Sequence, residues 1–458
     1  MDPSTPENTR REFLKRTAAM SALGIAGPTA LNMSAISRVA SANATDYKAL
    51  VCVFLYGAND HYNTFVPYDA DNYAIYSGFR STVATDLSML GSTVLFPARE
   101  LPDSKQYAFA PQLPDMHNLW QQQNLGVLLN VGPLAQPTTK LEYTSGNAVL
   151  PPKIFSHIDQ QSIWQSLSPE GSNIGWGGQM ADLFISENTN DIFTSISVFG
   201  DAVFLSGEAS VQYNLTPDGS IQIAPISGSV YGSAAVGASI RQLITAGHSH
   251  LIKRAHTDIT RRSIAANEIL TSALSTVGEI STPFQSGSLS AQLRMVAQMI
   301  AARDVLGLKR QVFFVGLGGF DTHNNLNNDH PPLLTEINSA MSAFYSATEE
   351  LGVSDQVTTF TASDFGRTLS NNNDGTDHGW GSHHMIMGSA VNGGDYYGIA
   401  PELGNNGPDD VGQGRLLPTT SVEQMAARLG RWFGCSESEL RDIFPSLPLF
   451  DDTNLNFM

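Results

Sequence analysis

Cysteine is almost absent from this sequence, because its 458 residues include only Cys52 and Cys435. Two cysteines cannot build a disulfide framework or a zinc site made of four thiolates. Cys52 lies within an apolar run, where a small buried hydrophobic residue is the ordinary role. We therefore expect two free thiols and no metal site that depends on cysteine.

Basic residues are also scarce: 25 Lys and Arg stand against 43 Asp and Glu, a formal net charge of −18. Without residues 1–44, which hold five basic and three acidic residues, the net charge becomes −20. Nucleic acids and anionic lipids require clustered Lys and Arg, so this composition predicts no nucleic-acid partner. An anionic small molecule or polymer remains possible as a substrate if a metal ion or a local arginine sets the charge of the site.

Several sequence patterns are missing as well. No stretch approaches the roughly 18 apolar residues of a membrane span, so the mature chain is expected to have no stable membrane span. The chain contains no GxSxG elbow, P-loop or GxGxxG followed by a suitable acid, so triad-hydrolase, NTPase and dinucleotide-binding functions lack support. It also contains no Cys-x-Pro-x-Arg signature.

Residues 1–44 have the pattern of a twin-arginine signal peptide. Residues 9–15 read TRREFLK, a moderately apolar run covers 17–33, and 40–44 read ASANA. This pattern predicts recognition by the twin-arginine translocation machinery, export in the folded state, and a periplasmic or extracellular location. Cleavage after Ala44 fits best, and cleavage after Ala42 fits nearly as well. A basic amphipathic N-terminal helix is the alternative interpretation, and it explains neither the paired arginines nor the Ala-x-Ala ending.

Residues 45–458 contain no linker or tandem repeat and are expected to form a single α/β domain. Its Gly- and Ser-rich segment near 165–230 is expected to be an excursion of small strands from the main sheet. Apolar runs predict strands, and helical periodicity predicts helices. The expected strands are 48–56, 125–131, 311–317 and 357–361, and the main expected helices are 113–123, 234–274, 288–306, 333–351 and 422–433.

The strand, helix and strand order over residues 311–361 predicts two parallel neighbours joined by a right-handed crossover. Both strands would then end at the same edge of a mostly parallel sheet, where open α/β sheets place their chemistry. The segment after the first strand, GGFDTH, offers Asp321 and His323. Such a pair suits zinc or manganese, while additional carboxylates would favour calcium or magnesium. A tight turn capped by Asp321 is the alternative.

The segment after the second strand, SDFGRT, offers Asp364 and Arg367. Arginine binds phosphate, sulfate or carboxylate oxygens through its planar fork, and a structural Asp364–Arg367 ion pair is the alternative. Three histidines, His378, His383 and His384, lie within a Gly-rich loop that has no good core-packing explanation.

Ser156 is a weaker candidate in the sequence. Its hydroxyl is either a nucleophile activated by a metal or a base, or the cap of a helix that begins beside it.

The assembled motifs resemble a large family of twin-arginine-exported, sulfatase-like bacterial proteins that is uncharacterised and related to the alkaline phosphatase superfamily. The resemblance covers nearly the whole mature chain and is carried by LVCVFLYGAND, FSHIDQQSIWQ, GGFDTH, SDFGRT and GTDHGWGSHH. It implies an alkaline-phosphatase-like three-layer α/β/α sandwich with one or two divalent metal ions at the carboxyl edge of the sheet. It also implies a Ser, Thr or formylglycine nucleophile, and the missing Cys-x-Pro-x-Arg signature argues against formylglycine.

The resemblance implies roles for individual residues. Asp60 matches the acid after the first strand, and the nucleophile falls near Ser156. The implied metal ligands are Asp60, Asp321, His323, Asp364 and a histidine from His378, His383 or His384. Phe365 departs from the superfamily pattern, because a histidine usually follows the acid at that point.

These observations lead to one functional hypothesis and one rival. The first is an exported metal-dependent hydrolase of a phosphate or sulfate ester, with Ser156 as nucleophile and Arg367 holding the anionic group. Its ion would be zinc, manganese or calcium. The rival is a noncatalytic exported binding protein that keeps the sulfatase-like fold.

Overall fold

A computed structural model describes residues 46–221, 223–227, 233–451 and 454–458. The signal peptide expected at residues 1–44 lies outside the described residues. The centre of the molecule is a 10-stranded sheet in the order β13-β4-β12-β9-β1-β8-β5-β6-β7, with β14 paired to β4. Its strands are β1 (Lys48–Tyr56), β4 (Leu125–Gly132), β5 (Ser195–Ser197), β6 (Tyr213–Thr216), β7 (Gly219–Ser220), β8 (Arg310–Gly318), β9 (Val357–Ser363), β12 (Ser382–Met387), β13 (Tyr396–Gly398) and β14 (Thr420–Ser421).

The sheet is mostly parallel. β1 pairs parallel with β8 on one side and with β9 on the other, while β12 runs antiparallel to both β9 and β4. The prediction that β8 and β9 are neighbours is wrong, because β1 lies between them. A strand, helix and strand order predicts that the two strands are parallel. It does not predict whether another strand lies between them in the sheet. Both strands still end at the same edge.

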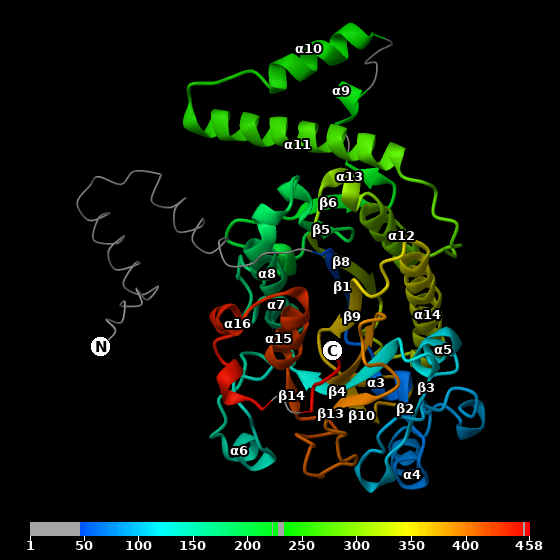
Figure 1. Cartoon of the computed structure of the whole chain (residues 1–458). Coiled ribbons are helices and arrows are strands. Elements are labelled where there is room, and N and C mark those ends of the chain that lie inside the picture. The colour runs from blue at the N-terminus through cyan, green and yellow to red at the C-terminus, as the bar shows by residue number, and fades with distance from the viewer. Residues whose placement is uncertain (1–45, 222, 228–232, 452–453) are drawn as a thin grey trace, which may run out of the picture.

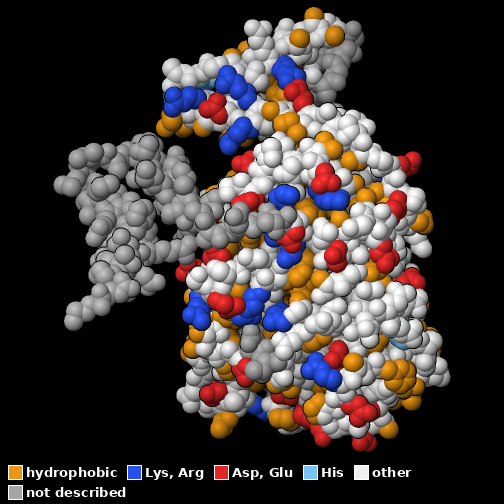
Figure 2. Space-filling view, viewed as in Figure 1, with side chains coloured by type: hydrophobic (Ala, Val, Ile, Leu, Met, Phe, Trp, Pro, Cys, Tyr) orange, Lys and Arg blue, Asp and Glu red, His pale blue; other side chains and the backbone are white. Residues whose placement is uncertain are grey.

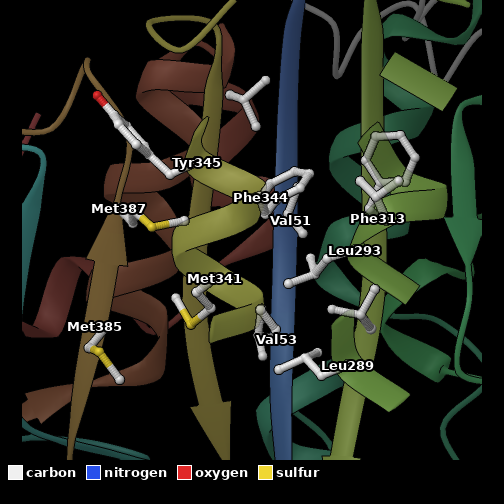
Figure 3. Close-up of a cluster of buried hydrophobic side chains, with 14 of the residues drawn as sticks. Val51, Val53, Leu289, Leu293, Phe313, Met341, Phe344, Tyr345, Met385 and Met387 are labelled. Carbon is white, nitrogen blue, oxygen red and sulfur yellow. The ribbon is translucent and has the colours of Figure 1, made fainter. Parts of the chain in front are cut away.

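Two long helices cover one face of the sheet. α12 (Ser288–Ala301) and α14 (Leu326–Glu350) pack their apolar stripes onto β1, β8 and β12. Figure 3 shows this contact, with Leu293 of α12 and Phe344 of α14 beside Val51 of β1. Burial of each such side chain contributes about 1.5–3 kcal/mol, so this layer accounts for much of the stability of the domain.

The opposite face is covered by helices from the middle and the end of the chain: α7 (His157–Ser166), α8 (Trp176–Phe184), α15 (Val422–Phe433) and α16 (Glu437–Ile443). Their side chains form a second core with β1, β8 and β9. Helices therefore lie on both faces (Figure 1), and the expected mostly parallel, three-layer α/β architecture is confirmed.

Smaller elements surround these layers. β2 (Phe65–Pro67) pairs with β3 (Tyr107–Phe109), and β10 (Arg367–Asn371) pairs with β11 (Thr376–His378). The remaining helices are α3 (His61–Thr64), α4 (Ala70–Phe79), α5 (Pro114–Gln121), α6 (Lys140–Ser145), α9 (Ala224–Ser227), α10 (Ala234–Ile244), α11 (Leu251–Thr276) and α13 (Arg303–Leu306). Short 3₁₀ turns cover Leu87–Met89, Pro102–Ser104, Ile185–Glu187, Asp191–Phe193, Val203–Leu205 and Leu447–Leu449.

Residues 165–230 contribute strands at one edge of the sheet, where β5 pairs parallel with β8 and β6 pairs parallel with β5. From this region α10 and α11 project away from the body, as Figure 1 shows. α11 is 26 residues long. Among the described residues, no helix is both long and apolar enough to cross a membrane.

Helix boundaries follow the sequence signals where capping residues mark them. Ser421 caps α15 through a capping box with Gln424, and Gly307 ends α13 in the left-handed conformation. α14 begins at Leu326, seven residues before the expected start, and carries Pro331 and Pro332 in its early turns. Proline lacks the backbone N–H group that a helix interior uses for hydrogen bonding. The sequence therefore predicted a helix that starts after both prolines.

Candidate metal centre

Three strands bring the polar motifs to one edge of the sheet. The register places Tyr56, the last residue of β1, opposite Gly318 of β8, and Leu55 opposite Ser363 of β9. Gly57 follows β1 with a φ of +107°, and a Cβ atom on it would lie 2.5 Å from the backbone nitrogen of Asp321. Only glycine permits this approach, which holds the three strand ends together.

Three imidazole rings converge at this edge. Nε2 of His378 lies 3.1 Å from Nε2 of His157 and 2.9 Å from Nε2 of His323. Oδ1 of Asp321 lies 3.1 Å from Nε2 of His323 and 3.5 Å from Nε2 of both His157 and His378. His157 comes from the first turn of α7, Asp321 and His323 from the segment after β8, and His378 from β11.

The other ring nitrogens are held by hydrogen bonds that fix the tautomers. Nδ1 of His157 donates to Oδ2 of Asp364 at 2.5 Å, and Nδ1 of His378 donates to the carbonyl oxygen of Phe155 at 2.8 Å. In a neutral imidazole the second nitrogen then carries a lone pair. The Nε2 lone pairs of His157 and His378 therefore face each other at 3.1 Å. Two facing lone pairs repel unless a proton or a cation lies between them.

The pKa values at the centre shift in different directions, since burial and the charges of His157 and Arg367 lower the pKa of His378. Partial burial lowers the pKa of His157, but the hydrogen bond and the charge of Asp364, together with the charge of Asp321, outweigh it and raise the pKa overall. Partial burial raises the pKa of Asp321, but the hydrogen bond and charge of Arg367 and the charge of His323 lower it overall. Asp321 therefore stays ionised, and its side chain is 45% exposed, so the centre opens to solvent.

Two overlapping groups of ligand atoms lie here. The atoms of His157, Asp321 and His378 lie within 4.8 Å of one another, and so do those of His323, Asp377 and His378. His378 belongs to both groups but offers a single Nε2 lone pair. The two groups therefore compete for one ion and do not hold two ions at once.

Asp364, which the sequence predicted as a metal ligand, is in neither group of candidate ligand atoms. Its carboxylate is fully buried and accepts bonds from Nδ1 of His157, Nε2 of Gln161 at 2.9 Å and the backbone N–H of Gly57 at 3.2 Å. His157 and Gln161 are four residues apart, so they share one face of α7. Asp364 thus orients His157, as carboxylates do for metal-binding histidines.

Phe365 stands where the resemblance leads one to expect a histidine ligand. Its ring is fully buried and packs 4.8 Å from the ring centres of both His157 and His378. The phenyl ring thus fixes the orientation of two imidazoles, and His157 from α7 contributes the imidazole that Phe365 cannot supply.

Arg367 also differs from its expected role. Its side chain has no exposed surface, and its Nη1 donates to Oδ1 of Asp321 at 2.8 Å, while Nε donates to Oγ1 of Thr376 at 3.1 Å and Nη2 to the backbone oxygen of Thr376. The structure therefore directs this guanidinium toward Asp321 and away from solvent. The expected alternative, an ion pair with Asp364, is replaced by the pair with Asp321.

Asp60 was expected to bind metal, and the structure places it elsewhere. Its carboxylate is fully buried, and Oδ2 forms an ion pair with Nη1 of Arg80 at 2.7 Å. Arg80 also donates to the backbone oxygens of Leu369 and Thr368, and its Nη1 to Oδ1 of Asn63. Asp60 therefore neutralises a buried arginine and is absent from both groups of candidate ligand atoms.

His383 and His384 point away from the converging rings because they alternate on β12. Nδ1 of His383 accepts the backbone N–H of Asn130 at 3.0 Å, and its ring packs against Phe65 and Tyr107. His384 packs against Trp164 on the other face. Burial lowers the pKa of each to about 3. His383, which the sequence predicted as a ligand, therefore lies outside both groups of candidate ligand atoms.

Ser156 lies at the N-cap of α7, directly before His157, and its Oγ donates to Oδ2 of Asp159 at 2.8 Å. The hydroxyl makes no capping bond to the helix. Nζ of Lys153 lies 3.3 Å from the same carboxylate oxygen.

Sequence reasoning missed two residues of the centre, His157 and Asp377. His157 is the third residue of FSHIDQQSIWQ, one of the motifs that carry the resemblance, and it begins helix α7. Asp377 is adjacent to His378 in the Gly-rich segment. A candidate ligand whose partner residues are distant in the sequence can be identified only from the tertiary structure.

Comparison with known proteins gives a family without an assigned activity. The family model described as "Protein of unknown function (DUF1501)" matches residues 47–444, so the chain belongs to this family. No curated protein matches the chain.

Solved structures resemble the chain only distantly. They include Ps i-CgsB in complex with k-i-k-neocarrahexaose (11% identity, TM-score 0.35, covering 88% of this chain and 76% of that chain). They also include the PsFucS1 sulfatase from Pseudoalteromonas sp. (9% identity, TM-score 0.32, covering 95% of this chain and 78% of that chain). A third is the lipoteichoic acid synthase LtaP from Listeria monocytogenes (7% identity, TM-score 0.35, covering 92% of this chain and 82% of that chain). A likeness this distant transfers neither activity nor metal content.

Proposed function

We propose that this member of the DUF1501 family is a metal-dependent hydrolase of a phosphate or sulfate ester. The observation that carries the proposal is the pair of imidazole lone pairs on His157 and His378, held 3.1 Å apart by hydrogen bonds to their other ring nitrogens. Because a proton or a cation between these atoms relieves the repulsion, the pair is placed to bind a metal ion in competition with a proton.

The donor set favours zinc or a similar transition-metal ion. In the first group, the imidazole nitrogens of His157 and His378 with one carboxylate from Asp321 suit zinc, whereas calcium prefers six to eight oxygen ligands. Manganese fits less well, because carboxylates are outnumbered. Because the two ligand groups share His378, we propose one ion at a time at this centre.

The nucleophile in this proposal is Ser156. Its Oγ attacks the phosphorus or sulfur atom, its proton passes to Asp159, and the bond to the leaving oxygen of the ester breaks. Asp159 accepts the hydrogen bond of this hydroxyl at 2.8 Å and is nearly buried, so it is placed to take the proton. Hydrolysis of the resulting seryl ester by water returns the enzyme.

Other residues of the chain keep the centre in shape. Asp364 and the ring of Phe365 fix the orientation of His157, and Arg367 holds Asp321. A bound divalent ion supplies charge neutralisation and lowers the pKa of a hydroxyl group that contacts it. Lys153, whose side chain is 67% exposed, offers a cation to an anionic substrate near Ser156.

Export by the twin-arginine route to the periplasm or beyond is part of this proposal. A folded protein that acquires its ion before export is the usual cargo of that route, and residues 9–15 carry its signature.

Metal content tests the first step. We expect the purified full-length protein to bind about one equivalent of zinc after treatment with chelator and reconstitution, and His157→Ala and His378→Ala to lose it. His256→Ala, which removes an exposed histidine of α11, is the matched control. Less than about a tenth of an equivalent of any divalent ion in the wild type would contradict the metal site.

Turnover tests the second step. We expect the zinc-loaded protein to hydrolyse an aryl phosphate or aryl sulfate, and Ser156→Ala to lower kcat at least about 100-fold with metal content unchanged. Bound zinc without turnover across both ester classes would favour the rival hypothesis, a noncatalytic binding protein, for which the buried position of Arg367 is the supporting observation.

A further inference from the structure

The hairpin of α10 and α11 projects from the end of the body that lies away from the candidate metal centre (Figure 1). We call residues 234–263 the basic arm; they comprise α10, the connecting loop and the first half of α11. The second half of α11 packs on the body through Ala266, Leu270 and Ala273.

Two residues of the basic arm are buried, Gly237 in α10 and Thr257 in α11. In α10, which has 11 residues, Gly237 is the one buried residue. Polar contacts link the helices: Arg241 pairs with Glu268, and Arg261 donates to the backbone oxygen of Thr245. A helix of this length is marginal in water unless a partner covers its apolar side chains.

An apolar stripe runs along the whole of α11. At 3.6 residues per turn, Leu251, Ile252, Ala255 and Ile259 lie on the same face as Ala266, Leu270 and Ala273. The second set is buried against the body, whereas Leu251, Ile252 and Ile259 are 69%, 73% and 56% exposed. The apolar stripe that contacts the body in the second half of α11 therefore extends, exposed, along the first half of the helix.

The charge of the basic arm is opposite to that of the rest of the chain. It holds five basic residues and one acid, Asp258, a net charge of +4 within a chain of −18, which leaves −22 for the remaining residues. Figure 2 shows Lys and Arg side chains gathered on the projecting hairpin next to hydrophobic ones. The basic residues are Arg241, Lys253, Arg254, Arg261 and Arg262.

We propose that the basic arm docks on the acidic body of a second copy of this chain, so that two copies exchange arms. The apolar stripe supplies the contact area, and the opposite charges of arm and body supply attraction and orientation. Contact between two arms is disfavoured, because each carries +4. The proposal is independent of the metal centre, which lies at the other end of the sheet.

Sedimentation velocity of the purified full-length protein tests the association. We expect a concentration-dependent dimer at 50 mM salt whose dissociation constant rises on the order of tenfold at 500 mM salt, since salt screens exposed opposite charges. A protein that stays monomeric up to about 200 µM at the lower salt overturns the proposal.

Variants of the arm identify the contact. Ile252→Asp with Ile259→Asp should abolish the dimer, whereas Val211→Asp, an equally exposed apolar residue at 76%, should leave it unchanged. Arg254→Glu with Arg262→Glu should weaken the dimer on the order of tenfold. Circular dichroism of each variant checks that the body is folded.

Three outcomes overturn the proposal. If all arm variants still form the dimer, the dimer interface lies at another surface of the protein. A dimer that tightens on charge reversal or in high salt is formed by arm against arm. A monomer that binds vesicles of anionic lipid, and does so less after Arg254→Glu with Arg262→Glu, assigns the arm to a membrane surface.

Discussion

Two groups of three histidines lie at the same edge of the sheet, and they differ in almost every physical respect. His157, His323 and His378 direct their Nε2 atoms toward one another at the surface. His61, His383 and His384 are buried among aromatic rings, and neither ring nitrogen of His61 has a hydrogen-bond partner.

The difference shows what makes a histidine a candidate ligand. Membership of a His-rich segment is not sufficient, because His378 and His383 come from the same segment and lie in opposite environments. Converging lone pairs, a partner that fixes the other ring nitrogen, and access for an ion are all required. The buried group lacks access for an ion, and although the Asn130 N–H holds one ring nitrogen of His383, burial holds the pKa of His61 well below its usual range.

The largest expected effect is on the buried side. Arg80→Leu leaves the Asp60 carboxylate without its ion-pair partner in a fully buried position, so we expect a loss of about 3–5 kcal/mol in the free energy of unfolding. Urea denaturation measures it. Adding Asp60→Asn to the variant should restore part of the loss, and no restoration would mean that Arg80 stabilises the protein through its backbone contacts.

The second prediction compares alanine variants of His378 and His383. We expect His378→Ala to weaken zinc binding at least about 100-fold while costing less than about 1 kcal/mol of stability. His383→Ala should do the opposite, costing about 2–4 kcal/mol through a cavity and an unpaired Asn130 N–H while zinc affinity stays the same. Titration calorimetry measures the zinc affinity of both variants, and denaturation measures their stability. A larger loss of zinc affinity in His383→Ala than in His378→Ala would contradict the proposed difference between the two histidines.

Acid sensitivity should follow the buried group. Burial lowers the pKa of His384 to about 3, below its unfolded value near 6.5, so its contribution to stability is complete above pH 6.5 and is lost as pH falls toward 3. We expect His384→Phe to reduce the loss of unfolding free energy between pH 7 and pH 5 by about 2 kcal/mol. An unchanged pH dependence would mean that folding does not lower the pKa of His384.

The smallest expected effect concerns the residue that positions a ligand. Asp364 accepts three hydrogen bonds, so Asp364→Asn must direct its NH2 group toward at least one of these donors and disturb His157. We expect zinc affinity to fall on the order of tenfold. Nitrogen NMR of the imidazole should show a changed tautomer for His157. Gln161→Met is the control, because it leaves the carboxylate on His157 and should change affinity less than about threefold.

Much of the fold was predictable because local signals agreed with the tertiary structure. The helical pattern at 422–433 and the apolar run at 48–56 each produced the expected element. The site was predictable only in part. Asp321 and His323 follow a strand end and His378 lies in a Gly-rich segment, whereas His157 begins a helix more than 150 residues earlier, where no neighbouring ligand residue marks it.

By itself the sequence determined the α/β class, the edge of the sheet that carries polar residues, and the residue types available there. These properties follow from hydrophobic periodicity and from the polar residues that end each strand. Only the tertiary structure decided that β1 lies between β8 and β9, that Asp60 pairs with Arg80, and that His383 points into the core. The physical reason is that side-chain direction depends on which strands pair and in what register, and pairing joins segments that are hundreds of residues apart.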